Sequence, residues 1–213
     1  MPDPIRVVIA DDHPLMRSGV RATLENADIT VVAEASDGVE MQRLCEEHSP
    51  DVLVMDISMP GPSFIDRVAF IKSLDADIKL LVLTAFEDTV YIQAMFKAGV
   101  EGYVLKDEVS ETLLTALHAV AGGGTYFSRR VLSKLNEFDF QSDSLASLTP
   151  RERDVLALLA QGHDNSSIAQ ELSLAEQTVR NYVSRLYEKT GLGSRVELVV
   201  WTLKHGLVDE ASV

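Results

Sequence analysis

The chain of 213 residues lacks the features that mark disulfide-bonded, zinc-binding or membrane proteins. A single cysteine, Cys45, excludes an internal disulfide, and no group of Cys and His residues has the spacing of a zinc site. No apolar run approaches the roughly 20 residues of a membrane-spanning helix. The start, Met1-Pro2-Asp3-Pro4, has neither the basic segment nor the long apolar stretch of a signal peptide. We therefore expect a cytoplasmic globular protein without a membrane partner.

Basic residues are also few, because 19 Lys and Arg stand against 33 Asp and Glu and give a net charge of −14. This total does not favour binding to nucleic acid. The acidity, however, is concentrated in residues 1–124, which carry 9 basic and 21 acidic side chains. Residues 148–213 carry 7 basic and 9 acidic side chains and are nearly neutral. DNA binding by the C-terminal part is therefore compatible with the composition.

The first half alternates short runs rich in Val, Ile and Leu with longer amphipathic stretches. The runs are 5–10, 30–35, 51–56, 79–85 and 102–106, and the stretches are 15–25, 39–47, 64–74, 89–98 and 110–121. Near-continuous apolar strands separated by helices predict a parallel sheet that is covered on both faces. We expect an α/β domain over residues 1–124, with a flavodoxin-like, doubly wound, five-stranded sheet. Residues 125–147 are expected to be a linker with a short helix at 128–136.

The remaining residues, 148–213, are predicted to form a small all-α domain of four helices. Thr149, Pro150 and Glu152 form a capping box that opens the first helix, which stops at Gly162. Further helices are expected at 166–172, capped by Asn165, at 176–190, and at 194–205, opened by Ser194 and Glu197. Four short helices with tight turns are typical of helix-turn-helix DNA-binding domains and occur in other small bundles as well.

Three carboxylates fall at the ends of neighbouring strands of the predicted sheet. Asp11 and Asp12 follow the first strand and Asp56 closes the third. Converging carboxylates repel one another unless a cation lies between them. Mg²⁺ suits a site with few carboxylates and several waters. The sequence therefore predicts a magnesium site at the carboxyl edge of the sheet.

A hydroxyl and an ammonium group accompany these carboxylates, because Thr84 ends the fourth strand and Lys106 the fifth. Together they can hold the oxygens of a phosphoryl group carried on a metal-bound carboxylate. Each residue taken singly has an ordinary explanation as a helix cap, a strand end or a surface charge. Their joint occurrence at the ends of four strands favours a site that accepts a phosphoryl group.

This order of residues resembles the receiver domain of two-component response regulators. The resemblance covers about residues 5–121 and rests on Asp11-Asp12, the stretch from Met55 to Gly61, Thr84-Ala85 and Lys106. It implies that Asp56 is the phosphoryl acceptor, with a sensor histidine kinase as donor. Asp11, Asp12, Asp56 and the backbone carbonyl of Ser58 would bind Mg²⁺, Thr84 and Lys106 would contact the phosphoryl oxygens, and Tyr103 would be the aromatic switch residue. Two departures are Phe64, where the family often has Gly, and Asp107, where many receivers have Pro.

Residues 148–208 resemble the LuxR-type helix-turn-helix domain of NarL/FixJ-class regulators. The matching residues include Leu148 to Glu152, Leu156 to Gly162, Ile168-Ala169 and Thr178 to Val183. In the helix at 176–190, one apolar stripe leaves a polar face that can enter a major groove, although a solvated helix face is an equally ordinary reading of the residues alone. The resemblance implies DNA contacts by Thr178, Arg180, Asn181, Ser184, Arg185 and Lys189. Ala175 is a departure, since the family usually has Ser or Thr at this N-cap.

The last predicted helix, 194–205, is more apolar than a small bundle needs. The resemblance implies that it pairs two DNA-binding domains in a homodimer through Val196, Val199, Val200 and Leu203. A core role for Trp201 is equally compatible with the pattern.

The sequence therefore predicts a transcriptional response regulator that binds an operator in double-stranded DNA after phosphorylation of Asp56, and not an enzyme. One alternative is a phosphatase that works through an aspartyl-phosphate. Such enzymes carry a second acid two residues after the nucleophile, where this chain has Ser58. Another is a regulator that binds DNA without phosphorylation. A flavin-binding module is a third, but Asp11-Asp12-His13 stands where a phosphate-binding loop needs Gly, Ser or Thr.

Overall fold

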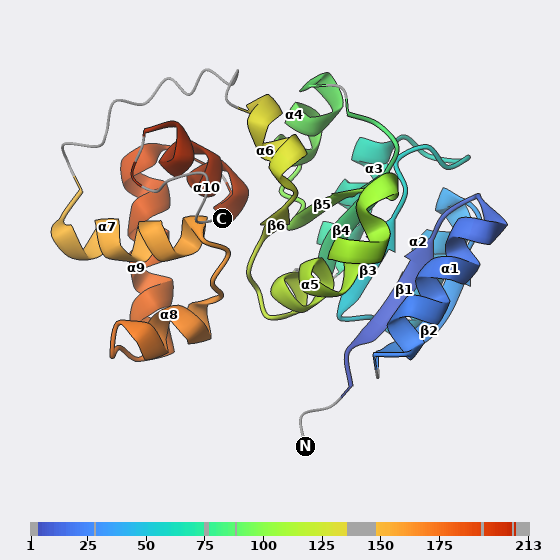
Figure 1. Cartoon of the computed structure of the whole chain (residues 1–213), viewed down its shortest axis with the longest axis horizontal. Coiled ribbons are helices and arrows are strands. Elements are labelled where there is room, and N and C mark those ends of the chain that lie inside the picture. The colour runs from blue at the N-terminus through green and yellow to red at the C-terminus, as the bar shows by residue number, and fades with distance from the viewer. Residues whose placement is uncertain are drawn as a thin grey trace.

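Six parallel strands form one sheet in the order β2-β1-β3-β4-β5-β6 in the computed structural model (Figure 1). The structure describes residues 4–27, 29–74, 77–87, 89–135, 148–192, 194–205 and 207. The strands are β1 (Arg6–Ala10), β2 (Thr30–Ala35), β3 (Val52–Met55), β4 (Lys79–Thr84), β5 (Gly102–Leu105) and β6 (Tyr126–Phe127). The predicted doubly wound α/β architecture is confirmed.

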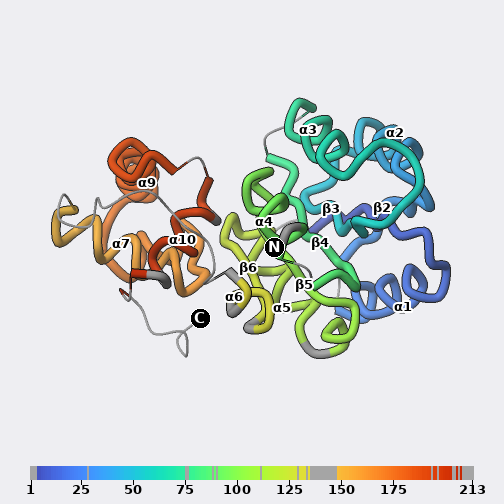
Figure 2. The backbone as a smooth tube through the Cα atoms, turned by 90° about the horizontal axis from the view of Figure 1, so that it is seen from above, coloured from blue at the N-terminus to red at the C-terminus, as the bar shows by residue number. Residues whose placement is uncertain are grey.

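Helices cover both faces of the sheet, as Figure 2 shows. On one face lie α1 (Pro14–Glu25) and α5 (Val109–Ala121), and on the other lie α2 (Gly38–His48), α3 (Phe64–Leu74) and α4 (Thr89–Lys97). Alternate residues of each strand enter the two cores, because side chains alternate across a sheet: Val7 faces α1 and α5, whereas Val8 faces the other layer. This layering exposes the carboxyl ends of the strands at one edge.

The sixth strand corrects the prediction of a five-stranded sheet followed directly by a linker. Tyr126 and Phe127 pair in parallel with Gly102 and Tyr103 of β5. Phe127 also stacks on Phe96 of α4, with 4.6 Å between the ring centroids. Pairing with β5 and stacking on α4 therefore extend the sheet beyond the turn at Gly122, Gly123 and Gly124. The short helix expected at 128–136 is α6 (Arg129–Leu135), and the rest of the predicted linker, 136–147, lies outside the described residues.

The C-terminal helices are α7 (Pro150–Ala160), α8 (Asn165–Glu171), α9 (Glu176–Thr190) and α10 (Arg195–Lys204). The Thr149–Glu152 capping box is confirmed at α7. The prediction for α8 was wrong by one residue, because Asp164 is the N-cap and accepts a hydrogen bond from the Ser167 N–H at 2.6 Å. Ala175 precedes α9 without any side-chain cap, as predicted. Every helix of the described residues is too short or too polar to span a bilayer.

The C-terminal helices pack against the α/β part. Val200 of α10 is buried in the core layer that contains α4 and α6. The loop between α7 and α8 approaches the end of α5 so closely that a Cβ atom on Gly122 would lie 2.7 Å from Asp164 Oδ2. Similarly, a Cβ on Gly124 would lie 2.5 Å from the carbonyl oxygen of Gly162. The two parts therefore form a closed arrangement with α10 between them (Figure 1).

Candidate phosphoacceptor and DNA-binding sites

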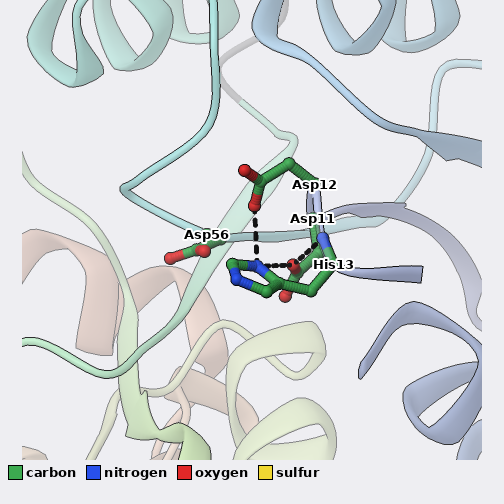
Figure 3. Close-up of side chains that lie close together, drawn as sticks. All are labelled: Asp11, Asp12, His13 and Asp56. Atoms are coloured by element: carbon green, nitrogen blue, oxygen red, sulfur yellow. Dashed lines mark hydrogen bonds and ion pairs between the residues drawn. The ribbon is translucent and has the colours of Figure 1, made fainter. Parts of the chain in front are cut away.

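The predicted carboxylates do converge at the carboxyl ends of β1 and β3 (Figure 3). Backbone bonds extend the sheet by one residue past each strand and fix the carboxylates in place: the Asp56 N–H donates to the Ala10 carbonyl oxygen at 2.8 Å. Asp11 and Asp56 are each 2% exposed, and Asp12 is half-buried. Ligand atoms of Asp11, Asp12, Asp56 and His13 all lie within 4.8 Å of one another.

Lys106 connects two of these carboxylates. Its Nζ lies 2.8 Å from Asp11 Oδ2 and 2.7 Å from Asp56 Oδ2. Burial lowers the pKa of Lys106, but hydrogen bonds and charge from Asp11 and Asp56 outweigh burial and raise the pKa above its ordinary value. Lys106 is therefore an ammonium group that neutralises one of three negative charges and leaves the pocket negative.

The residues present fit Mg²⁺, because the remaining charge is carried by carboxylate oxygens, the donors that a hard divalent cation prefers. His13, the fourth member of the cluster, was not predicted from the sequence. Its Nδ1 lies 3.1 Å from Asp11 Oδ1 and 2.8 Å from Asp12 Oδ1. The only signal was its position directly after the two acids. The His13 side chain is 65% exposed, so it can leave the carboxylates without unpacking any core.

A cavity of about 400 Å³ opens beside the carboxylate of Asp56. Its walls include Asp56, Ser58, Thr84 and Lys106, all four predicted as site residues. Thr84 is buried, and its Oγ1 accepts a hydrogen bond from the Phe86 N–H at 3.3 Å. The hydroxyl and the ammonium group on the walls of this cavity are groups that can bind the oxygens of a phosphoryl group on Asp56.

Tyr103, the predicted switch residue, lies on β5 with its ring fully buried. Its hydroxyl donates to the Phe86 carbonyl oxygen at 2.7 Å. Burial, and secondarily the charge of Asp56, raise the pKa of Tyr103 well above its ordinary value, so the phenol stays a hydrogen-bond donor. Thr84 and Tyr103 thus both bind the backbone of Phe86, which links the cavity beside Asp56 to β5.

Most of the predicted DNA-contacting side chains are exposed on α9. Arg180, Asn181, Ser184 and Arg185 are exposed, whereas Thr178 is half-buried. Lys189 is exposed as well, but its Nζ lies 2.7 Å from Oε2 of the buried Glu152 on α7. Arg180 forms an ion pair with Glu176 of the same helix. The exposed side chains are therefore open to a groove, and the two cations Arg180 and Lys189 already have acidic partners within the domain.

The predicted dimerisation residues on α10 are covered where the structure describes them. Val199 and Val200 are each 2% exposed. The side chains of Val196 and Leu203 lie outside the described residues. In this arrangement the described part of the predicted dimerisation surface is inaccessible to a second copy of the chain.

Comparison with known proteins decides what these two parts are. The response regulator receiver domain family matches residues 7–118, and the luxR family of bacterial regulatory proteins matches residues 146–202. The chain is a response regulator with a LuxR-type DNA-binding domain.

Relatives of this response regulator match it over nearly its whole length. It is 37% identical over 217 residues to the oxygen regulatory protein NreC of Staphylococcus epidermidis. The alignment covers 96% of this chain and 100% of NreC. Among solved structures it is similar to two RcsB dimers bound to two parallel DNAs (27% identity, TM-score 0.60, 95% of this chain and 99% of RcsB). It is also similar to ChrA, the response regulator of a heme-sensing two-component system (33% identity, TM-score 0.52, 96% and 98%).

Proposed function

We propose that phosphorylation of Asp56 by a sensor histidine kinase switches this response regulator into a DNA-binding dimer. The observation that carries the proposal is the convergence of Asp11, Asp12, Asp56 and Lys106 beside a cavity that also contains Thr84. Carboxylates for a divalent cation, beside an ammonium group and a hydroxyl, are the groups that a phosphorylated aspartate needs around it.

In the proposed reaction, a carboxylate oxygen of Asp56 attacks the phosphorus of the donor, and the bond from phosphorus to the donor breaks with its electron pair leaving on the donor. Lys106 and the Thr84 hydroxyl bind the transferred phosphoryl oxygens. Asp11, Asp12, Asp56 and the Ser58 carbonyl would hold Mg²⁺, which supplies positive charge for the phosphoryl oxygens. A histidine kinase or a small phosphodonor can serve as the source.

The signal would leave the pocket through the loop after β4. A Thr84 hydroxyl that turns to the phosphoryl group gives up its bond to Phe86, whose carbonyl holds Tyr103. The next residue, Glu87, binds Arg130 and, at 3.1 Å, Lys134 of α6. Because α6 and α10 pack on the same layer as α4, a shift of this loop loosens the cover over α10.

Release of α10 would then allow dimerisation through Val196, Val199, Val200 and Leu203, with α9 placed in a major groove of double-stranded DNA. Thr178, Arg180, Asn181, Ser184, Arg185 and Lys189 are the proposed DNA contacts. The solved structure of RcsB dimers on DNA supports a dimer as the DNA-bound form.

The experiment is a selection of duplexes from a random-sequence DNA library with the Mg²⁺- and beryllofluoride-treated protein, followed by titration of the enriched sequence. We expect tight binding by the treated wild type, and weak binding by the untreated protein, by Asp56→Ala and by Asn181→Ala. Equal affinity of treated wild type and Asp56→Ala would favour the regulator that works without phosphorylation.

A further inference from the structure

Arg67 is a buried arginine on α3 that the site described above does not use. Its side chain is 1% exposed, and its backbone N–H donates to the Ser63 carbonyl oxygen at 3.0 Å in the first turn of the helix. A long side chain on a helix points back toward the helix N-terminus, here toward the loop that follows Asp56. A buried guanidinium is costly unless other groups compensate its charge, so its position calls for an explanation.

The compensation comes from the loop and the acceptor itself. Nη2 of Arg67 donates to the Ile57 carbonyl oxygen, while Nε and Nη1 are buried without a hydrogen-bond partner among the described residues. The Phe64 ring centroid lies 6.0 Å from the guanidinium carbon. Burial lowers the pKa of Arg67 below its ordinary value, and the charge of Asp56 raises it. The acid whose charge acts on this cation is therefore the proposed phosphoryl acceptor.

The carbonyl that Arg67 binds belongs to the same peptide group as an N–H that reaches Asp56. The Ser58 N–H donates to Asp56 Oδ1 at 3.3 Å. A peptide group is planar, so a bond that fixes its carbonyl also fixes the direction of its N–H. Hydrogen bonds in series polarise one another, and a cation on the carbonyl oxygen makes the N–H a stronger donor.

Gly38 at the start of α2 leaves room for this arginine. A Cβ atom on Gly38 would lie 2.8 Å from Arg67 Cδ and 3.3 Å from the Pro60 carbonyl oxygen. The Gly38 N–H also donates to that oxygen at 2.8 Å. A side chain at position 38 would therefore displace Arg67 without removing it.

We propose that Arg67 is a positioning residue for phosphoryl transfer to Asp56. It fixes the Ile57–Ser58 peptide so that the Ser58 N–H faces the acceptor, and its charge stabilises the more negative phosphorylated carboxylate. The inference rests on the proposed role of Asp56 and adds a residue that the receiver resemblance does not include.

The test compares Arg67→Met, which removes charge and hydrogen bonds, with Arg67→Lys, which keeps the charge. The full chain is incubated with saturating Mg²⁺ and acetyl phosphate, and phosphorylation is followed by intact mass. We expect Arg67→Met to react about tenfold more slowly and Arg67→Lys to recover much of that loss, because an oriented donor and its charge act together. Arg43→Met, an exposed arginine of α2, is the matched control and should react at the wild-type rate.

A second readout is the backbone amide resonance of Ser58 in a ¹⁵N–¹H correlation spectrum without phosphodonor. It should move in Arg67→Met and return toward its wild-type position in Arg67→Lys. Gly38→Ala gives an independent variant should Arg67→Met fail to fold: it keeps the arginine, displaces it, and should slow phosphorylation in the same direction.

Wild-type rates and an unmoved Ser58 amide in Arg67→Met and Gly38→Ala would overturn the inference. A loss of rate that Arg67→Lys does not recover, with the amide unmoved, would also contradict it. A wild-type chain that accepts no phosphoryl group would instead contradict the proposed function, and the amide resonance would still decide whether Arg67 holds the peptide.

Discussion

Lys106 keeps together carboxylates that would otherwise repel one another. Its Nζ contacts Asp11 and Asp56 within 2.8 Å, and both acids are almost fully buried. The Lys106→Met variant should lose about 3 kcal/mol of unfolding free energy, as expected when one partner of a buried ion pair is removed. Mg²⁺ should then stabilise the variant more than the wild type, because the divalent ion replaces the missing cation.

Urea unfolding with and without Mg²⁺ measures both effects, and Lys97→Met, an exposed lysine on α4, is the control. An equal gain in unfolding free energy on addition of Mg²⁺ to the wild type and to Lys106→Met would show that the metal and the lysine do not bind the same carboxylates.

A second buried acid, Glu152, stabilises the DNA-binding domain. Burial raises the pKa of Glu152. The Lys189 ammonium and the hydrogen bonds from Thr149 lower it by more than burial raises it, so the pKa lies below the ordinary value of 4.5. A carboxyl group whose pKa is lowered by folding stabilises the folded state at pH values above its ordinary pKa. This stabilisation is lost as the pH falls through the folded-state pKa. Glu152→Gln should therefore cost about 1–2 kcal/mol at pH 7.

That cost should shrink as the pH falls through the lowered folded-state pKa of Glu152, because the carboxyl then becomes protonated in the wild type as well. Fluorescence of Trp201, the single tryptophan and fully buried in the same domain, reports the unfolding. Glu188→Gln, on the exposed face of α9, should leave the stability unchanged both at pH 7 and at acid pH. A Glu152→Gln cost that stays constant with pH would contradict the ion-pair explanation.

Residues whose role follows from a strand end could be predicted from the sequence. Asp11, Asp56 and Lys106 were found because each follows an apolar strand directly, and parallel strands bring such positions together. Arg67 was not found, because its importance depends on burial against the loop after β3. The ion pair of Lys189 was missed for a similar reason, since Glu152 lies on another helix.

The helix α9, which carries the proposed DNA contacts, begins without a side-chain cap at Ala175. Serine at this position can accept a hydrogen bond from a free N–H of the first turn, so Ala175→Ser should add about 1 kcal/mol to the stability of the domain. The urea midpoint followed by Trp201 fluorescence measures the gain. Ala175→Val, which offers no hydrogen-bond acceptor, should not raise the urea midpoint. Equal urea midpoints for the Ser and Val variants would contradict the prediction.

The helices and five of the six strands were predictable, because apolar periodicity and capping residues act locally. The strand β6 was not, since a pair of aromatic residues becomes a strand only through pairing with β5 and stacking on α4. The N-cap of α8 was misplaced because Asp164 and Asn165 are adjacent residues that both cap helices well.

At the scale of the whole molecule, the closed arrangement covers α10 and leaves much of the polar face of α9 exposed. Gly122→Leu should separate the two parts, because a Cβ at this position would lie 2.7 Å from Asp164 Oδ2. Its nearest atoms in α5 lie at 3.4 Å or more, which is ordinary van der Waals distance. We expect the unphosphorylated variant to bind DNA about tenfold more tightly than the unphosphorylated wild type, a typical size for coupling between domains.

Titration of a selected DNA duplex measures this change, and small-angle scattering should show a more extended particle. Gly19→Leu on α1, where a Cβ meets nothing within 4 Å, is the control. An opened Gly122→Leu variant with wild-type DNA affinity would show that the domain contact does not restrain DNA binding.

Dimerisation and DNA binding are both proposed to follow from the transfer of a phosphoryl group to Asp56. The most direct measurement is the intact mass of the purified chain after incubation with Mg²⁺ and acetyl phosphate, beside the Asp56→Ala variant. We predict a gain of one phosphoryl mass in the wild type, dependent on Mg²⁺ and absent in the variant. An unchanged mass of the wild type, or an equal gain in Asp56→Ala, would contradict the proposal that Asp56 accepts the phosphoryl group.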